Sequence, residues 1–492
     1  MRTLLLGVDI GTSSCKTALF DPEGKIAAQG GHEYPVSYPR KGWAEQDPDL
    51  WWDGVCRAVR EMISENGINP AEIAGIGTDG QSWSAIALDR AGNVLCPTPI
   101  WTDTRSGEIC RETAEALTEE RLFGLCGNPA KPGYTWPKIL WYRKHRPEVY
   151  EKTEKILQSN SYIVYRMTGE ITQDLSQGYG LACFDMRKGS WDDGMCEELG
   201  IPRKLLPEIV PCHRTVGRLT KAAAAQMGLR EGIPVAAGGL DAACGTLGAG
   251  VVSPGQTQEQ GGQAGGMSIC IDQYAADPRL ILGFHVVPGR WLLQGGTTGG
   301  GGALKWLRET LCPELSFAEM SALAETAEPG SSGVTFLPYM AGERSPIWDP
   351  DACGVFFGLN FGVNRAQMIR ACMEGVAYAL RHNLETAAEA GARADVLRAM
   401  GGSANSRIWT QIKADVTGCR IEVPGSDTAT TLGAAMLAGV GNGVWQSFEE
   451  AARQTIQVNR CHEPDPAMKE IYDRGYGVYR QLYERLKDLM RQ

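Results

Sequence analysis

The sequence predicts an α/β protein of at least two domains, in which mixed β-sheets are covered by helices. The chain has 492 residues, too many for one hydrophobic core at roughly 100–200 residues per domain. It begins with a run of strands, then a helix, then another strand. A Pro- and Gly-containing break, VVSPG (251–255), interrupts the middle of the chain. There we place the boundary between domains 1–252 and 253–492.

The N-terminal part carries the clearest signals of secondary structure. Short apolar runs separated by turn residues predict a three-stranded antiparallel meander over 3–36. Apolar residues at helical spacing predict a helix over 48–65. A short apolar run predicts a buried strand at 73–80, and turn residues predict a second hairpin over 84–95.

The rest of the chain alternates helical and Gly-rich segments. Residues 110–235 look helical and irregular, and 255–271 and 290–296 predict further strands. Helices are expected at 302–311, 316–327, 364–391, 403–417 and 466–491. The last helix carries one apolar stripe, which we expect to pack on its own domain; a partner-binding helix is the alternative.

Composition and charge exclude several classes of protein. The net charge of −10 argues against nucleic-acid binding as the main function. No run approaches the ~18 apolar residues of a membrane span, and the N-terminus lacks the features of a signal peptide. The 15 cysteines form no C-x-x-C pair, which favours reduced thiols and a cytoplasmic location.

Glycine is over-represented, with 61 residues against a usual share of ~7%, and this favours loops that approach a ligand. One such loop is the turn between the first two strands, where backbone N–H groups can hold phosphate oxygens. Thr12, Ser13 and Ser14 add hydroxyl groups there. Lys16 adds a cation, and Asp9 is a candidate ligand of Mg²⁺. An ordinary hairpin turn is the alternative.

Three further Gly-rich segments are candidates for binding or catalysis. Segment 238–250 contains a single carboxylate, Asp241, which can act as a general base toward a bound hydroxyl or as a helix N-cap. Gly295–Gly302 and Gly401–Asn405 each precede an expected helix. That arrangement favours a phosphate, or the approach of a base and sugar, although close packing would also explain either loop.

The segment Trp101–Arg105 (WTDTR) combines an aromatic ring, the carboxylate of Asp103 and a guanidinium. A polyol suits this mixture, and a surface salt bridge beside a half-buried Trp is the alternative. Other motifs are excluded: the G-x-G-x-x-G at 75–80 precedes an expected strand instead of the helix of a dinucleotide site, and no P-loop occurs. The six His lie far apart, which gives little support to a metal cluster.

Taken together, these segments resemble the FGGY carbohydrate kinases. The resemblance rests on DIGTSSCK (9–16), WTDTR (101–105), GLDAACGTLGAG (239–250), LPYMAGERSP (337–346), GVFFGL (354–359) and GGSANSRIWTQIKADVTG (401–418). Two longer patterns, 133–145 and 354–375, look like the family's two motifs, with Tyr142 and Cys372 as departures. The match runs in order along most of the chain.

The resemblance implies two actin-like (ribonuclease H-like) domains with a ligand cleft between them. It implies a sugar- and phosphate-binding domain at 1–252, a nucleotide-binding domain at 253–492, and ATP-dependent phosphorylation of a sugar or polyol hydroxyl. Mg²⁺ is the expected metal, and a homodimer is left open. In-line phosphoryl transfer fits this picture, because it needs mainly positioning, charge neutralisation and a base.

The resemblance also implies roles for single residues. Asp241 would be the general base, and Asp9 would hold Mg²⁺. The nucleotide and its phosphates would be bound by Gly11, Thr12, Ser13, Ser14, Lys16, Gly262, Gln263, Gly301, Lys305, Gly401, Gly402 and Asn405. The sugar pocket would consist of Gln81, Ser82, Trp83, Trp101, Asp103 and Asp241.

Departures from the family pattern bear on the substrate. Glycerol kinases usually have Gln-Arg-Glu at Gln81–Trp83, and xylulokinases have Met-His there and Asp-Asn at Asp241. The loop 262–265 (GQAG) replaces Gly-Thr-Ser-Gly and loses a hydroxyl. The leading hypothesis is a xylulokinase-like enzyme for a ketopentose such as xylulose or a related polyol. The alternatives are another substrate (aldonate, tetritol, hexulose), a catalytically weak sugar or nucleotide sensor, and an actin-like ATPase acting on a polypeptide.

Overall fold

The computed structural model describes residues 2–181, 183–425 and 428–491. The chain forms two compact units: the first contains the segment ending at Val252 together with Gly283–Trp291 and Thr428–Ile456, and the second contains the remaining segments. The units are therefore discontinuous in sequence, unlike the continuous halves 1–252 and 253–492. The 15 cysteines, all within the described residues, form no disulfide bonds. Among the described residues, none of the helices combines the length and apolarity needed to cross a membrane.

The first unit is a β-sheet with helices on both faces and an irregular helical region. Its strands are β1 (Leu4–Ile10), β2 (Ser14–Phe20), β3 (Ile26–Glu33), β4 (Glu45–Gln46), β5 (Ile73–Gly80), β6 (Ile86–Leu88), β7 (Thr98–Pro99), β8 (Lys155–Leu157), β9 (Thr172–Asp174), β10 (Phe184–Asp185), β11 (Ser190–Trp191), β12 (Glu208–Val210), β13 (Thr215–Arg218), β14 (Pro234–Ala236) and β15 (Gly239–Leu240). Its helices are α1 (Pro48–Glu65), α2 (Gly107–Leu117), α3 (Glu119–Cys126), α4 (Thr135–His145), α5 (Pro147–Tyr150), α6 (Ser159–Thr168), α7 (Asp193–Leu199), α8 (Lys221–Met227), α9 (Asp241–Gly248), α14 (Ala429–Gly441) and α15 (Phe448–Thr455).

The main sheet of this unit has the order β13-β14-β5-β1-β2-β3, with β15 beside β5. Strands β1, β2 and β3 pair antiparallel, so the predicted meander is confirmed. Strand β5 pairs parallel with β1 and is followed by β6, not by the helix of a dinucleotide site. Helix α1 covers the predicted range, with Asp47 as its N-cap.

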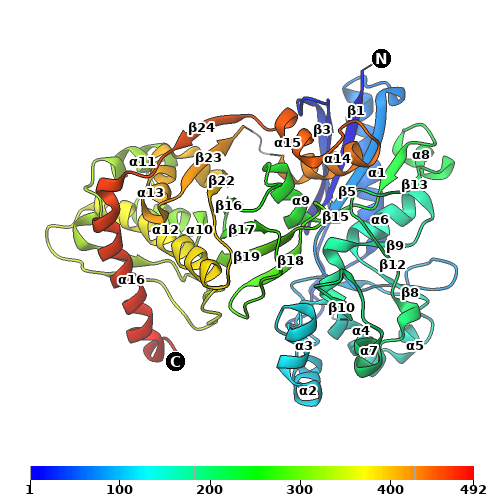
Figure 1. Cartoon of the computed structure of the whole chain (residues 1–492), viewed down its shortest axis with the longest axis horizontal. Coiled ribbons are helices and arrows are strands. Elements are labelled where there is room, and N and C mark those ends of the chain that lie inside the picture. Colours follow the sequence, from blue (N-terminus) through cyan, green and yellow to red (C-terminus); the bar gives the residue numbers. More distant parts are fainter. Residues whose placement is uncertain (1, 182, 426–427, 492) are drawn as a thin grey trace. The chain divides into compact units, whose positions relative to one another are not determined.

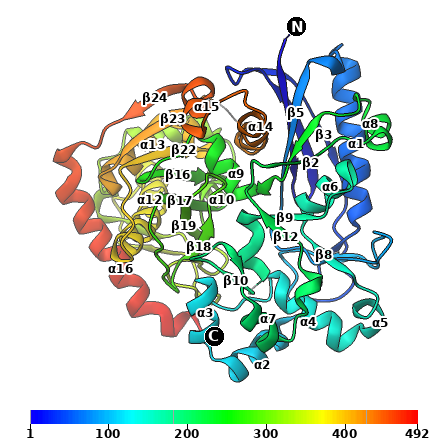
Figure 2. The same cartoon turned by 45° about the vertical axis from the view of Figure 1, so that its right-hand side comes forward.

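Side chains of β1 alternate between the two faces of the sheet. Leu4 and Leu6 belong to the same buried core as Trp51 of α1. On the other face, α14 approaches so closely that a Cβ at Gly7 would lie 1.9 Å from the carbonyl oxygen of Thr431. Figure 2 shows α1 and α14 on opposite sides of these strands. Glycine in the centre of the sheet thus permits direct contact with the helix backbone.

The second unit repeats this plan. Its sheet contains β16 (Gln256–Gly261), β17 (Gly265–Ile271), β18 (Ile281–Phe284), β19 (Trp291–Thr297), β22 (Val396–Met400), β23 (Arg420–Pro424) and β24 (Val458–His462) in the order β18-β19-β17-β16-β22-β23-β24. A small sheet pairs β20 (Thr335–Leu337) with β21 (Val355–Phe357). The helices are α10 (Gly301–Leu311), α11 (Phe317–Glu325), α12 (Arg365–Glu389), α13 (Arg407–Thr417) and α16 (Lys469–Met490). Strand β16 pairs antiparallel with β17 and parallel with β22 (Figure 1).

The C-terminal helix α16, red in Figure 1, packs on its own unit. Tyr472, Tyr479 and Leu482 are buried in one core with residues of α12 and α13. The expectation for the apolar stripe of 466–491 is therefore confirmed. The predicted strands at 255–271 and 290–296 and the helices α10 to α13 are also present, with ends shifted by a few residues.

Candidate functional site

The turn between β1 and β2 is held in one shape by its neighbours. The backbone N–H of Gly11 donates to the carbonyl oxygen of Ser14 at 3.0 Å, and the Tyr34 hydroxyl donates to the Gly11 carbonyl at 2.7 Å. The indole N–H of Trp101 donates to Thr12 Oγ1 at 3.0 Å. The structure therefore brings together the predicted phosphate turn and the predicted sugar residue Trp101.

Three aspartates gather beside this turn. Asp9 on β1 lies in register with Asp79 on β5, and β15 pairs with β5 so that Gly239 lies opposite Asp79. Asp241 follows β15 directly, as the first residue of α9. Asp79 is 0% exposed and Asp9 6%. Asp79 was not among the predicted residues, because only the strand register reveals its proximity to Asp9 and Asp241.

The polar contacts of these aspartates differ. Thr430 of α14 donates to Asp9 Oδ2 at 3.0 Å, and the backbone N–H of Ala242 donates to Asp241 Oδ1 at 2.6 Å. Both carboxyl oxygens of Asp79 are buried without a hydrogen-bond partner among the described residues. Lys16 on β2 lies in register opposite Asp9.

Burial raises the pKa of all three groups, and the negative charge of Asp9 adds to this effect at Asp79 and Asp241. Burial raises the pKa of Asp79 well above its ordinary value, and the negative charge of Asp9 raises it further. Burial also raises the pKa of Asp9, while Asp79 and Lys16 partly offset this effect. For Asp241, burial and the charge of Asp9 raise the pKa to about 7. A half-buried carboxylate with such a pKa suits a general base at neutral pH.

The predicted sugar residues Gln81, Ser82 and Trp83 follow β5. Gln81 is buried, and its side-chain amide donates to Gln46 Oε1 at 2.8 Å while its own Oε1 has no partner in the described part of the chain. Ser82 is half-buried. Trp83 has a positive φ of 58°. Its ring makes edge contacts with Tyr134 and Tyr179 at centroid distances of 4.5 and 5.6 Å, so a cluster of three aromatic rings forms here.

A pocket of about 560 Å³ lies within the second unit. It is lined by Gly261, Gly262, Gln263, Gly301, Leu304, Lys305, Phe317, Ala318, Ser321, Gly402, Ser403, Asn405, Ser406 and Trp409. Six predicted nucleotide residues, from three separate segments, thus meet in one pocket. The seventh nucleotide residue predicted in this unit, Gly401, directly precedes the lining residue Gly402. It has a positive φ of 83°, and a Cβ there would lie 3.0 Å from the Gly261 carbonyl oxygen.

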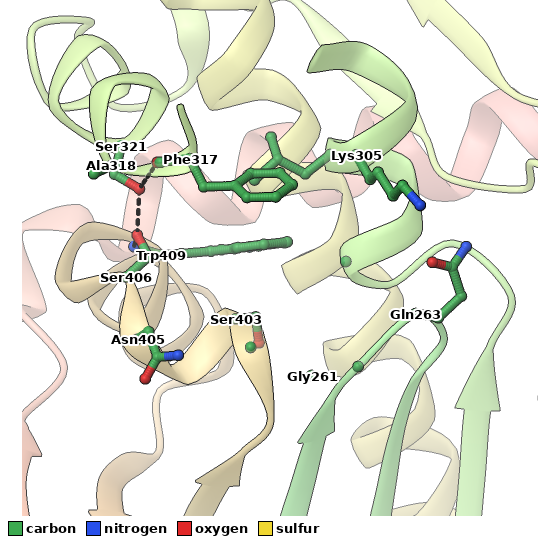
Figure 3. A pocket seen from close by; sticks show the side chains of 14 residues that line it. Gly261, Gln263, Lys305, Phe317, Ala318, Ser321, Ser403, Asn405, Ser406 and Trp409 are labelled. Atoms are coloured by element: carbon green, nitrogen blue, oxygen red, sulfur yellow. Dashed lines mark hydrogen bonds between the residues drawn. The ribbon is translucent and has the colours of Figure 1, made fainter. Parts of the chain in front are cut away.

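The two ends of this pocket differ in chemistry. Figure 3 shows the rings of Phe317 and Trp409 facing each other, and the side chains of Lys305 and Gln263 beyond them at the other end. The hydroxyl groups of Ser321 and Ser406 share a hydrogen bond of 2.9 Å behind the rings. Sequence reasoning assigned no role to these side chains: Ser406 and Trp409 lie in the quoted segment 401–418 without a role of their own, and Phe317 and Ser321 lie on α11, which carries no local motif.

Comparison with known proteins identifies the family. The sequence matches the FGGY family of carbohydrate kinases, N-terminal domain, over residues 4–248, and the C-terminal domain of the same family over residues 274–441. The chain belongs to the FGGY family of carbohydrate kinases. It is an ATP-dependent sugar kinase of xylulokinase-like sequence.

Individual FGGY relatives are similar over nearly the whole chain. A xylulose kinase of Bacillus subtilis is 32% identical over 487 residues, covering 99% of this chain and 97% of that protein. A xylulose kinase of Escherichia coli is 31% identical over 490 residues, covering 99% and 100%. The crystal structure of xylulose kinase from Rhodospirillum rubrum superimposes with a TM-score of 0.93 at 30% identity, covering 99% of this chain and 100% of that chain. The predicted fold class is confirmed.

In this FGGY kinase, Asp103 is engaged inside the protein. It is 0% exposed, and its carboxylate accepts hydrogen bonds from the Arg105 guanidinium at 2.7–3.0 Å and from the Ala44 backbone N–H at 2.7 Å. Arg105 also pairs with Glu45 at 2.7 Å. Trp101, by contrast, is 44% exposed. Within the WTDTR segment, the ring of Trp101 is therefore exposed, whereas the carboxylate of Asp103 is fully engaged by Arg105 and Ala44.

A buried lysine that sequence reasoning passed over connects the segments of this site. Lys138 on α4 donates to the carbonyl oxygens of Trp83, Ile100 and Gly133 at 2.7, 2.8 and 2.7 Å. Burial lowers its pKa to about 7, while the charge of Asp103 acts in the opposite direction. One side chain therefore fixes the loop after β5, the WTDTR segment and the start of α4.

The loop between β16 and β17 closes the N-terminus of α10. The backbone N–H of Gly301 donates to the Gly262 carbonyl at 2.7 Å, and that of Gly302 donates to the Gln263 carbonyl at 2.9 Å. These N–H groups are therefore occupied by the protein itself. A phosphate at this end of the pocket would depend on the side chains of Lys305 and Gln263 instead.

The residues around Asp9 fit a magnesium ion. Asp9 and Asp79 bring two carboxylates together, and the oxygens of Asp79 are buried without a donor. Mg²⁺ prefers hard oxygen ligands and is usually held by one or two carboxylates together with substrate phosphates. A cation beside the Asp9 carboxylate would also favour the charged forms of these buried groups.

Proposed function

We propose that this kinase transfers the γ-phosphoryl group of ATP to a hydroxyl of an open-chain ketopentose such as xylulose. The observation that carries the proposal is the position of Asp241, half-buried among carboxylates beside the β1–β2 turn, with a pKa of about 7. The similarity to xylulose kinases over nearly the full chain supports the choice of substrate.

Asp241 is the general base of the proposed reaction. Its deprotonated carboxylate accepts the proton of the attacking hydroxyl as the oxygen bonds to the γ-phosphorus and the bond to the ADP oxygen breaks. The products are the sugar phosphate, ADP and a protonated Asp241. The hydroxyls of Thr12, Ser13 and Ser14 and the ammonium group of Lys16 bind the transferred phosphate, and Gly11 closes the tight turn that presents these hydroxyls.

Asp9 is the proposed ligand of magnesium in this scheme. Thr430 fixes one of its oxygens by a hydrogen bond of 3.0 Å, and the carboxyl group of Asp79 lies beside it in the neighbouring strand. When bound with ATP, the metal neutralises negative charge on the phosphates.

The pocket of the second unit is the proposed nucleotide site. Phe317 and Trp409 offer two aromatic faces for the base, and Gly401, Gly402 and Asn405 bracket the adenosine. Gly262, Gln263, Gly301 and Lys305 face the phosphates. These assignments make 1–252 the sugar- and phosphate-binding domain and 253–492 the nucleotide-binding domain, apart from the segments Gly283–Trp291 and Thr428–Ile456, which belong to the first unit.

The sugar is assigned to Gln81, Ser82, Trp83 and Trp101 together with Asp241, with Asp103 as support. The partly exposed ring of Trp83, held by the buried rings of Tyr134 and Tyr179, is assigned to the C–H face of a sugar, and the Oε1 of Gln81 is assigned as an acceptor for a hydroxyl. The free cysteines support a reducing compartment such as the cytoplasm.

A coupled assay of ADP release tests the proposal. Pentuloses, pentitols, hexuloses, tetritols and aldonates are supplied with ATP and Mg²⁺, and xylulose is expected to give the highest kcat/KM. A faster aldonate or hexulose would replace the substrate. Saturable sugar binding without ADP release from any compound would favour the sensor hypothesis, and peptide-stimulated hydrolysis of ATP would favour the polypeptide-acting ATPase.

A further inference from the structure

A buried lysine lies directly beneath the pocket of the second unit. Lys413 on α13 is 2% exposed, and its Nζ lies 2.6 Å from Glu259 Oε1, which is 4% exposed. The same Nζ lies 2.8 Å from Ser403 Oγ. It also lies 5.1 Å from the ring centroid of Trp409. One ammonium group therefore contacts β16, the turn Gly402–Asn405 and α13.

Each of these three contacts involves a residue that lines the pocket or lies two positions from one that does. Glu259 stands two residues before Gly261, and Gly261, Ser403 and Trp409 all line the pocket. A Cβ at Gly261 would lie 1.6 Å from Ser403 Oγ and 3.3 Å from Lys413 Nζ. The Ser403 hydroxyl thus lies directly over the glycine that ends β16, and Lys413 holds it there.

The chemistry of this contact fixes the role of the serine hydroxyl. An ammonium group can only donate hydrogen bonds, so Ser403 Oγ is the acceptor and its own O–H remains a donor. Within the described residues, Ser403 donates no hydrogen bond that would use this proton, and Glu259 Oε2 has no partner. A ligand in the pocket is therefore the acceptor that this hydroxyl can reach.

A purely structural role explains this ion pair poorly. Removing two charges from water is costly, and a buried ion pair is often no more stabilising than apolar residues of similar volume. A buried ion pair is more readily explained where it holds polar groups in one arrangement. Here the pair holds the end of β16, the turn Gly402–Asn405 and the Ser403 hydroxyl at the wall of the pocket.

We propose that Lys413 is a positioning residue for the nucleotide: it holds the Ser403 hydroxyl so that its proton is donated to an oxygen or nitrogen acceptor of the bound nucleotide. The inference rests on the nucleotide site proposed above. Lys413 itself does not touch the nucleotide. Its effect passes through Ser403, and through Glu259 to the end of β16.

The test is a double-mutant cycle with nucleotide affinity as the readout. ADP binding is measured by calorimetry for the wild type, Ser403→Ala, Lys413→Met and the double variant. Each single change is expected to weaken binding roughly tenfold, the effect of losing one hydrogen bond. The double variant is expected to resemble the weaker single variant, because both changes remove the same contact. KM for ATP should rise with kcat and the sugar KM nearly unchanged.

A second buried ion pair of the same unit provides the matched control. Arg370 and Glu374 on α12 are 6% and 2% exposed and lie 2.9 Å apart, and neither lines the pocket. Glu374→Gln should lower the melting temperature and leave ADP affinity unchanged, whereas Glu259→Gln should lower both.

The outcomes separate this inference from the site on which it rests. Wild-type protein that binds no ADP would overturn the nucleotide site and the inference with it. Wild-type binding combined with an ADP affinity of Ser403→Ala within twofold of wild type would overturn only the role of Lys413 and Ser403. Additive losses in the double variant would also overturn it. Because Ser403→Ala removes a single hydroxyl, it decides the question even if Lys413→Met fails to fold.

Discussion

The two sheets contain the same hairpin, used for different purposes. In each, a strand pairs antiparallel with the next strand and parallel with a later one: β1 with β2 and β5, and β16 with β17 and β22. In each, an acidic residue stands two positions before the glycine at the turn, as Asp9 does before Gly11 and Glu259 before Gly261.

The acidic residues differ in their partners. Glu259 is neutralised by Lys413 at 2.6 Å. Asp9 makes no ion pair with any described residue and faces a second carboxylate, Asp79, in the next strand. A paired charge stabilises a fixed loop, whereas unpaired charge at a strand end is available to a metal ion, a proton or a substrate. The comparison predicts that substitutions in the first hairpin affect the chemical step and those in the second affect nucleotide affinity.

The largest effect is expected at Asp241. Asp241→Asn keeps the shape of the side chain and removes the base, so kcat should fall by roughly 10²–10⁴-fold. Steady-state kinetics with xylulose measures this fall. As a control for folding, the ADP affinity of Asp241→Asn should equal that of the wild type, because the proposed nucleotide pocket lies in the second unit. Near-normal turnover in Asp241→Asn would show that another group accepts the proton.

Asp9→Asn should give the next largest effect. Loss of this charge should lower kcat by roughly 10²–10³-fold, as removal of one electrostatic stabiliser does in other enzymes. In the matched hairpin position, Glu259→Gln should raise KM for ATP roughly tenfold and leave kcat nearly unchanged. Titration with Mn²⁺ and ATP, followed by electron paramagnetic resonance, should show weakened metal binding for Asp9→Asn alone. Equal effects of Asp9→Asn and Glu259→Gln on kcat would contradict the assignment of different roles to the two hairpins.

The pH dependence of the reaction provides an independent check. The base must be deprotonated, and the pKa of Asp241 is raised to about 7. Below this value kcat/KM for the sugar should fall about tenfold per pH unit. The profile should shift to lower pH in Asp9→Asn, because the charge of Asp9 raises the pKa of Asp241. A profile that stays flat down to pH about 5 would contradict the assignment of Asp241 as base.

Local sequence predicts the hairpins well and the residues between them poorly. The segment around Asp9 and Gly11 follows from apolar runs and turn residues within one short stretch, and so does the 255–271 hairpin. Asp79 lies in a predicted strand, but its position beside Asp9 depends on parallel register, which no local pattern specifies. The contacts of Lys413 join residues 154 and 10 positions apart. Nothing in the sequence of α13 separates Lys413 from an ordinary lysine on a helix.

Local sequence also does not predict that the chain returns to the first unit near its C-terminal end. The segment 428–456 includes α14, whose backbone touches Gly7 and Gly77 of the first sheet. Its sequence, ATTLGAAMLAGVG, is apolar on every side, so its periodicity does not identify a partner. The match between Gly7 of β1, Gly77 of β5 and the backbone of α14 becomes meaningful only once the three elements are placed.

The smallest effect concerns stability, and its sign distinguishes Asp79, on β5 beside the first hairpin, from Glu259 in the second hairpin. The folded-state pKa of Asp79 is raised, so its contribution to stability is present below the ordinary Asp pKa of about 3.9 and is lost as pH rises through the folded value. Asp79→Asn should therefore raise the melting temperature at pH 8 by roughly 2–4 °C, the equivalent of about 1 kcal/mol, and the gain should disappear near pH about 4. Glu259→Gln should lower the melting temperature at pH 8, because it leaves Lys413 buried without its counter-charge. Scanning calorimetry at both pH values measures these shifts. Destabilisation by both substitutions at pH 8 would mean that Asp79, like Glu259, has a charged partner, and the contrast between unpaired and paired carboxylates would no longer hold.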